Sequence, residues 1–198
     1  YAPPTHRRPF QMSAPLVFIT GASSGIGEAL AQRYAQAGYR LALVARRTEQ
    51  MQAWADARQL DASRCRVYGA DVAQIDSIVA AGQRCLAEQG LPDVVIANAG
   101  ISVGMDTEQR EDLDVMSQTF ALNNTGLAAT FHPFVAGMRV RGSGRLVGIA
   151  SVASVRGLPG HGAYCASKAA VISYCESLRV ELQRSGVQVV TICPGFVA

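Results

Sequence analysis

The sequence predicts a doubly wound α/β fold, in which helices cover both faces of one parallel sheet. Short apolar runs alternate with longer amphipathic segments along the chain, and a glycine-rich turn follows the first run. A length of 198 residues, with 49% hydrophobic and 17% charged residues, fits one domain with a sizeable core. Such alternation implies parallel strands joined by right-handed crossovers. Ligands then bind beyond the carboxyl ends of the strands, where the strand order reverses.

The glycine-rich turn lies between the first predicted strand, at 16–19, and the first helix. It reads Thr20-Gly21-Ala22-Ser23-Ser24-Gly25-Ile26-Gly27. Residues without a Cβ let backbone N–H groups approach a pyrophosphate, and the following helix adds unpaired donors and a positive dipole end. Glycines also serve ordinary turns, so this stretch alone leaves a dinucleotide cradle and a plain loop equally open.

The remaining elements follow in order from their apolar patterns. We expect strands at 40–45, 65–69, 93–97, 144–150 and 187–192. The first helix is expected to bury Ile26, Ala29, Leu30 and Ala37 and to be capped by Gly38. The second helix starts at Thr48 as N-cap and turns Met51, Trp54 and Ala55 inward. The third helix carries the stripe Ile75, Ile78, Val79, Gly82 and Leu86.

Two longer helices complete the pattern. One carries the stripe Leu113, Met116, Phe120, Asn123, Leu127, Phe131 and Phe134, and the other starts near Gly162. Asn123 is the polar member of its stripe, and leaving such an amide buried and unpaired costs roughly 1 to 3 kcal/mol. It therefore marks a helix kink, a satisfied core amide or the floor of a site.

Composition and charge exclude several classes of function. The net charge is +3, and the arginines form scattered pairs and one small cluster without interleaved aromatics, so we expect no nucleic-acid partner. No apolar run is long enough for a membrane span, and the first residues do not resemble a secretory signal. Without a C-x-x-C pair or a histidine cluster, no metal site is expected. The odd number of cysteines predicts reduced, buried thiols in a cytoplasmic protein: Cys65, Cys85, Cys165, Cys175 and Cys193.

The two ends of the sequence differ from the rest. Residues 1–14 are aperiodic and carry proline and arginine, so we interpret them as a disordered leader or cloning-derived segment, with Met12 a candidate original start. A single folded domain is then expected over residues 15–198.

Three residues near the predicted strand 144–150 and the last helix suggest chemistry. Tyr164 and Lys168 are four apart and share a helix face, and Ser151 lies at a strand end. With these, the chain resembles the short-chain dehydrogenase/reductase family, whose fold is Rossmann-like. The matching motifs are T-G-A-S-S-G-I-G at 20–27, Asp71-Val72, N-A-G at 98–100, N-N-T-G at 123–126, Ser151, Y-C-A-S-K at 164–168 and Pro194-Gly195.

The resemblance implies four catalytic residues. Tyr164 would be the general acid in carbonyl reduction and the base in alcohol oxidation, because a neighbouring ammonium, that of Lys168, stabilises phenolate. Lys168 would also bond the nicotinamide ribose. Ser151 would hold the substrate oxygen, and Asn123 would anchor a water that relays protons from Lys168.

Cofactor contacts follow from the same resemblance. The backbone of Gly21, Ile26 and Gly27 would hold the pyrophosphate. Asp71 and Val72 would meet the adenine, whereas Asn98, Ala99 and Gly100 would flank adenine and ribose, although Asn98 can equally be a turn former. Further expected contacts are Ser24, Tyr164, Lys168, Pro194, Gly195 and Val197. The family often has asparagine where this chain has Ala97, which we expect to matter little.

The choice of cofactor follows from charge. An acid about 20 residues after the glycine turn selects NAD, whereas an arginine there accommodates the 2′-phosphate of NADP. Arg46 and Arg47 occupy that place and no acid lies between Gly38 and Thr48. We therefore expect NADP(H), bound by Arg46 with help from Ser23; a solvated arginine pair is the alternative.

These observations leave three hypotheses for function. The first is an NADP(H)-dependent carbonyl reductase or alcohol dehydrogenase acting on a small molecule. The second is a 3-oxoacyl thioester reductase with carrier-bound substrates, and the third is a non-catalytic NADP-sensing module. The family implies a homotetramer or homodimer, formed through the helices that begin near Leu113 and Gly162. It also implies a substrate loop and a final strand after the Pro-Gly turn, which we expect to be missing from a chain that stops at Ala198.

Overall fold

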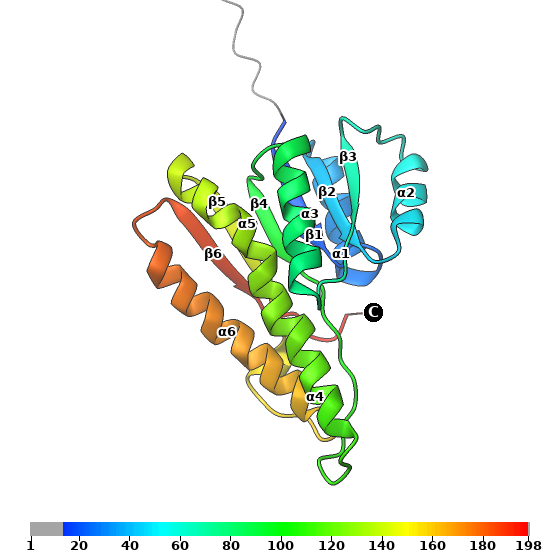
Figure 1. Cartoon of the computed structure of the whole chain (residues 1–198), viewed down its shortest axis with the longest axis vertical. Coiled ribbons are helices and arrows are strands. Elements are labelled where there is room, and N and C mark those ends of the chain that lie inside the picture. The colour runs from blue at the N-terminus through cyan, green and yellow to red at the C-terminus, as the bar shows by residue number, and fades with distance from the viewer. Residues whose placement is uncertain (1–13, 198) are drawn as a thin grey trace, which may run out of the picture.

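Six parallel strands form one sheet in the computed structural model, which describes residues 14–197 (Figure 1). The strands are β1 (Leu16–Thr20), β2 (Arg40–Ala45), β3 (Cys65–Gly69), β4 (Val94–Ala97), β5 (Gly144–Ile149) and β6 (Val187–Ile192). Their order is β3-β2-β1-β4-β5-β6, and all neighbours pair in parallel. The order reverses between β1 and β4, so the crevice for a ligand is expected at the carboxyl ends of these two strands.

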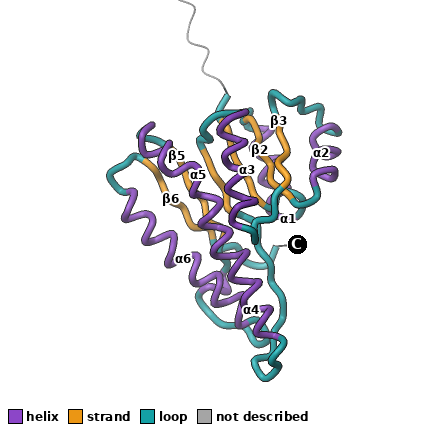
Figure 2. Tube along the Cα trace, viewed as in Figure 1, coloured by secondary structure: helices purple, strands orange, loops and turns teal. Residues whose placement is uncertain are grey.

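Helices cover both faces of the sheet, which confirms the doubly wound, single-domain prediction (Figure 2). They are α1 (Gly25–Gln36), α2 (Thr48–Asp56), α3 (Ile75–Glu88), α4 (Asp112–Phe120), α5 (Gly126–Arg141) and α6 (Gly162–Leu182). Strand β1 is buried on both sides: Leu16 and Phe18 pack with α3, α5 and α6, whereas Val17 and Ile19 pack with α1 and α2. Alternate residues of one strand thus build two separate cores.

The predicted helix over 113–134 consists of three successive segments. Helix α4 passes into a π-helical stretch, Ala121–Thr125, and then into α5. A π-helical turn is wider than an α-helical one because its hydrogen bonds reach one residue further. Asn123, the polar member of the predicted stripe, lies inside this stretch and is buried.

Several details of the predicted helices are wrong. In α1 the buried residues are Gly27 and Ala31, which are four apart and share the helix face that packs on the sheet. Ala29 and Ala37 lie off this face and are exposed. Thr48 is the first helical residue of α2 instead of its N-cap; Arg47 holds that position and makes no side-chain cap bond.

Some residues expected in the core are exposed. Ile75 opens α3 and is 52% exposed, and Leu113 and Met116 on α4 are 43% and 38% exposed. Cys193 is exposed as well, because it lies beyond the end of β6; the other four cysteines are buried and free, as predicted.

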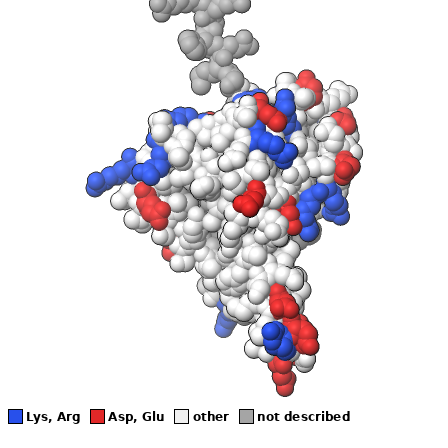
Figure 3. Space-filling model, viewed as in Figure 1, with Lys and Arg blue, Asp and Glu red and all other residues white. Residues whose placement is uncertain are grey.

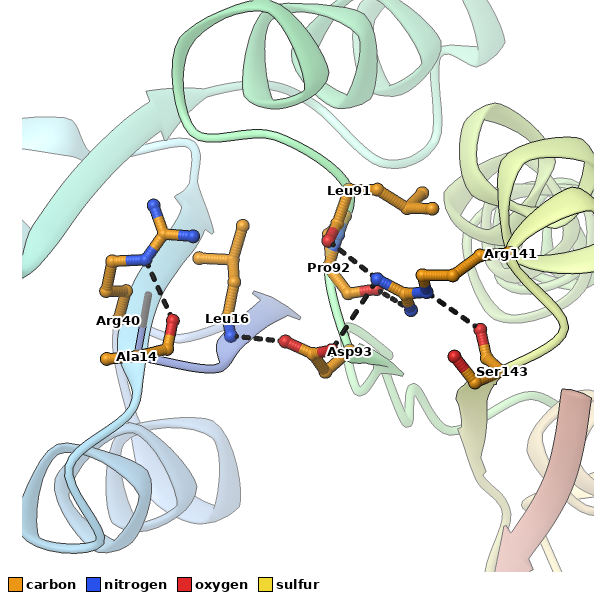
Figure 4. Close-up of polar contacts among 8 residues, drawn as sticks. All are labelled: Ala14, Leu16, Arg40, Leu91, Pro92, Asp93, Arg141 and Ser143. Atoms are coloured by element: carbon orange, nitrogen blue, oxygen red, sulfur yellow. Dashed lines mark hydrogen bonds and ion pairs between the residues drawn. The ribbon is translucent and has the colours of Figure 1, made fainter. Parts of the chain in front are cut away.

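The amino ends of the central strands are tied by the side chains of Asp93 and Arg141 (Figure 4). The Asp93 carboxylate accepts a hydrogen bond of 2.8 Å from the backbone N–H of Leu16, and pairs with the guanidinium of Arg141 at 3.5 Å. Arg141 also donates to the carbonyls of Leu91, at 3.1 Å, and Pro92, at 2.7 Å. This network, the amino-edge tie, joins β1, β4 and α5 at the edge opposite to the strands' carboxyl ends.

The expected leader lies outside the described residues apart from Ala14, and so does Ala198. Across residues 14–197, every helix falls short of the length or apolarity that a membrane span requires. On the face drawn in Figure 3, acidic and basic side chains are interspersed.

Candidate active site

Thr20 and Asn98 hold the glycine turn in place. The Oγ1 of Thr20 accepts hydrogen bonds from the backbone N–H groups of Asn98, at 3.1 Å, and Ala99, at 3.2 Å, and donates to the carbonyl of Ile96. The amide of Asn98 donates in turn to the carbonyls of Thr20 and Gly21, at 3.0 and 3.2 Å. The ends of β1 and β4 are thereby locked together at the point where the strand order reverses.

The glycines at positions 21 and 27 are required by close approach. Gly21 has a φ of +65°, and a Cβ there would lie 2.8 Å from the Cα of Ala99. A Cβ on Gly27 would lie 2.1 Å from the carbonyl oxygen of Gly21. Helix α1 therefore starts directly against the turn, with its free N–H groups next to the cleft described below.

A cleft of about 340 Å³ opens over the glycine turn. Its lining includes ten of the predicted cofactor residues: Gly21, Ser23, Ser24, Ile26, Arg46, Asp71, Val72, Asn98, Ala99 and Gly100. Gly27 is not in the lining, because it lies behind the turn. Five other lining residues were not predicted from the sequence: Val44, Ala45, Ala70, Ile101 and Leu122. Arg47, noted in the sequence beside Arg46, also lines the cleft.

The charge of this cleft comes from the segment after β2. Arg46 and Arg47 are both exposed and both line the cleft. Asp71 is the sole acid in the described lining, and one oxygen of its carboxylate accepts a hydrogen bond of 3.0 Å from the N–H of Ala73. The end of the cleft beside β2 is therefore suited to an anion.

The cleft continues into a second cavity of about 250 Å³ at the ends of β4 and β5. The two share Ile26, Asn98, Gly100 and Ile101. The second cavity is lined by three of the four predicted catalytic residues and by the last predicted cofactor residues: Ser151, Tyr164, Lys168, Pro194, Gly195 and Val197. A third cavity of about 230 Å³ adjoins it through Ser102, Ser151, Tyr164 and Gly195. One continuous groove thus runs from Arg46 to the surroundings of Tyr164.

Lys168 is the buried charge of the second cavity. Only 5% of the residue is exposed, and its ammonium donates a hydrogen bond of 2.8 Å to the carbonyl of Ile149 at the end of β5. Burial lowers the pKa of this ammonium to about 8, because the charged form is deprived of water. The Nζ atom lies 5.9 Å from the centroid of the Tyr164 ring, one helical turn earlier on α6.

Ser151 is held by a short 3₁₀ turn, Val152–Ser154, directly after β5. Its Oγ accepts a hydrogen bond of 3.1 Å from the N–H of Ala153, and the Oγ of Ser154 accepts one of 3.3 Å from the N–H of Ser151. Because its oxygen serves as the acceptor of this cap, the hydroxyl hydrogen of Ser151 is left to donate into the cavity.

The Asn123 side chain lies behind the cavities and is not part of their lining. Its Oδ1 accepts from the N–H of Ile101 at 2.9 Å, and its Nδ2 donates to the carbonyl of Ile101 at 3.0 Å and to the Oγ of Ser167 at 2.9 Å. Both amide hydrogens are therefore used within the protein. The amide is a satisfied core group inside the π-helical stretch, and a water relay at Asn123 stays a prediction.

Comparison with known proteins identifies the family. The model of the family described as short chain dehydrogenase matches residues 15–198. The chain belongs to the short-chain dehydrogenase/reductase family and is an oxidoreductase of that class. The family was predicted correctly from the sequence, because its motifs occur in the family's order between Thr20 and Gly195.

Relatives and solved structures agree with this assignment. The chain is 40% identical over 187 residues to an "Uncharacterized oxidoreductase" of Myxococcus xanthus, covering 94% of this chain and 74% of that protein. It superposes with a TM-score of 0.87 and 32% identity on a short-chain dehydrogenase from Streptomyces avermitilis, covering 94% of this chain and 67% of that one. An alcohol dehydrogenase from Thermococcus sibiricus, complexed with 5-hydroxy-NADP, gives a TM-score of 0.84 at 29% identity over 93% of this chain and 77% of its own. The chain spans 53% to 62% of the length of several other curated relatives.

Proposed function

We propose that this protein is an NADP(H)-dependent oxidoreductase that interconverts a carbonyl and a secondary alcohol in a small-molecule substrate. The observation that carries the proposal is the continuity of the groove. The cleft above the glycine turn opens directly into the cavity lined by Ser151, Tyr164 and Lys168. A dinucleotide bound along the first would have its reactive end beside the second.

The residues of the groove fit a phosphorylated dinucleotide. The turn before α1 offers backbone donors for a pyrophosphate, and Arg46 and Arg47 offer positive charge for a 2′-phosphate. Asp71, the acid in the lining, follows β3 rather than β2, where an NAD-selecting carboxylate is expected. A neighbour of similar fold is complexed with an NADP derivative, which supports the same choice.

The chain's own groups would supply proton transfer and charge stabilisation. When bound, the cofactor supplies or accepts the hydride. Tyr164 would give a proton to the substrate oxygen, while the Ser151 hydroxyl donates a hydrogen bond to the same oxygen as its charge develops. The Lys168 ammonium, held on the Ile149 carbonyl, would stabilise the phenolate left behind.

A homo-oligomer, dimeric or tetrameric, is part of this proposal. It is supported by exposed apolar side chains on the adjacent helices α4 and α6, namely Leu113, Met116 and Tyr174. Light scattering coupled to size exclusion measures the state, and a Met116→Asp variant is expected to shift it toward monomer.

The test of function is NADPH oxidation against ketones, aldehydes and 3-oxoacyl thioesters. We expect Tyr164→Phe to lower kcat by roughly 10²-fold or more, because the proton donor is lost. Tyr174→Phe makes the same change on the same helix at an exposed position and should keep full activity. Arg46→Ala should raise KM for NADPH at least about tenfold, since one charge-assisted phosphate contact is lost, and leave KM for NADH unchanged.

Three other outcomes would each change the proposal. Tight NADPH binding without turnover of any substrate would favour a sensing module and refute the enzyme. Turnover confined to 3-oxoacyl thioesters would assign the substrate to carrier-bound acyl chains. An equal loss for NADH and NADPH in Arg46→Ala would remove the basis for NADP selectivity.

A further inference from the structure

Met105 makes two hydrogen bonds that join the loop after β4 to the start of α6. Its backbone N–H donates to the carbonyl of Gly160 at 2.8 Å. Its thioether sulfur accepts from the backbone N–H of Ala163 at 3.2 Å. One residue therefore bonds both sides of the boundary at which α6 begins, at Gly162.

The second of these bonds replaces a missing helix cap. The N-cap residue of α6, His161, makes no side-chain cap bond. Ala163 is the second residue of the helix, and the N–H at that position has no partner within the helix and is usually bonded by the N-cap side chain. Ala163 is fully buried, so water cannot take that place. The sulfur of Met105 is the acceptor that the helix itself does not supply.

The helix turn that Met105 caps also carries Tyr164. Tyr164 directly follows Ala163, and its backbone carbonyl accepts from the Ser167 Oγ at 2.8 Å, so its position depends on the order of this first turn. The same loop that carries Met105 supplies Ser102, which lines the second and third cavities together with Ser151 and Tyr164. The two bonds of Met105 thus fix two walls of the groove relative to each other.

We propose that Met105 is a positioning residue for the reaction, in that its thioether caps α6 and holds Tyr164 against the substrate end of the groove. This inference rests on the proposed function for its effect on catalysis, but the cap itself does not. Met105 is not in the lining of any of the three cavities, so its effect is exerted through Ala163 and Tyr164.

Two variants of Met105 distinguish the effect of its hydrogen-bond acceptor from the effect of its side-chain volume. Met105→Leu keeps a similar apolar volume and removes the acceptor, whereas Met105→Gln keeps an acceptor oxygen near the position of the sulfur. Val140→Ala, at a 91% exposed position near the end of α5, is the control. Amide hydrogen exchange of the peptide that contains Ala163 and Tyr164 reports the cap. Carbonyl reduction with NADPH, read as kcat and KM separately, reports the positioning.

We expect Met105→Leu to speed exchange in this peptide and to lower kcat roughly tenfold, since small misplacements of a catalytic group have effects of this order or more. The dissociation constant for NADPH should stay within about twofold of wild type, and Met105→Gln and Val140→Ala should behave like wild type. Unchanged exchange in Met105→Leu would overturn the cap. Faster exchange with unchanged kcat would overturn the positioning role. If the wild-type protein reduces no carbonyl at all, the proposed function fails, and the exchange result alone decides whether Met105 caps α6.

Discussion

At the scale of single residues, Lys168 combines burial with a positive charge, and it is the only lysine in the sequence. Its burial lowers the pKa of the ammonium to about 8 from 10.5. In protein labelled with ¹³C-lysine, one side-chain signal should therefore titrate with a midpoint near pH 8. A midpoint above 10 would show that the ammonium keeps its water and would contradict the burial seen in the structure.

The same pKa makes a prediction about stability. Between about pH 8 and 10.5 the unfolded chain binds a proton at Lys168 that the folded chain has lost, so this site adds stability as pH rises through that window. Below pH 8 the full cost of burying the charge is present. The shift corresponds to at most about 3 kcal/mol.

The Lys168→Met variant isolates that contribution. The difference in unfolding free energy, wild type minus variant, should grow more favourable to wild type as pH rises from 8 to 10 in urea titrations. All other ionisable groups are common to both proteins, so comparing the two isolates the effect of replacing Lys168. A difference that is constant with pH would contradict the prediction.

At the scale of elements, the turn between β1 and α1 depends on Gly27. A Cβ at this position would lie 2.1 Å from the Gly21 carbonyl oxygen, so Gly27→Ala must push α1 away from the turn. We expect a loss of roughly 1 to 3 kcal/mol of unfolding free energy, as for other changes that overpack a tight contact. NADPH affinity should fall at least about tenfold, because the donors of the helix start are displaced.

Gly38→Ala is the matched control for this element. Gly38 follows the other end of α1 with a φ of +83°, and a Cβ there would meet nothing within 4 Å. Its replacement should cost about 1 kcal/mol through backbone strain and leave NADPH affinity unchanged. Calorimetry and cofactor fluorescence measure the two quantities. Equal loss of affinity in both variants would mean that general destabilisation, and not the turn, explains the effect.

The elements also show what the sequence could predict. The strands were predictable because each is an apolar run bounded by turn residues, and Ser151, Tyr164 and Lys168 were predicted to meet because strand ends and helix periodicity place them together. Contacts between distant segments were not predictable. Thr20 bonds Asn98 across 78 positions, and Met105 bonds Ala163 across 58. No local pattern marks a threonine or a methionine as the acceptor for a backbone group that far away.

Asn123 illustrates the same limit within one helix. Its polarity on an apolar stripe correctly indicated a special position, but polarity alone could not distinguish a kink from a satisfied amide. In the structure the amide is satisfied by Ile101 and Ser167, and the helix around it widens into a π-helical stretch. A single polar residue therefore predicts where a helix departs from regularity better than it predicts the reason.

At the scale of the whole molecule, the parallel sheet separates stability from function. All strands run in one direction, so the groove lies at their carboxyl ends and the amino-edge tie of Asp93 and Arg141 lies at the opposite edge (Figure 4). The ion pair in this tie is partly exposed, with 29% and 47% of the two side chains accessible, and contributes little by itself. The bond from Asp93 to the N–H of the fully buried Leu16 is the stronger contribution, because its loss leaves a buried donor unpaired.

This separation predicts that Asp93→Ala changes stability without changing catalysis. We expect the unfolding free energy to fall by about 1 to 3 kcal/mol in urea titrations, with an unchanged dependence on urea concentration. The kcat and KM for NADPH should stay those of wild type. Arg66→Ala, which breaks the exposed 3.0 Å pair with Glu88 at the edge strand β3, should cost less than about 1 kcal/mol. If the two variants lose the same unfolding free energy, the bond to Leu16 is not what stabilises the amino ends of the strands. If Asp93→Ala raises KM for NADPH, the amino and carboxyl ends of the sheet are coupled.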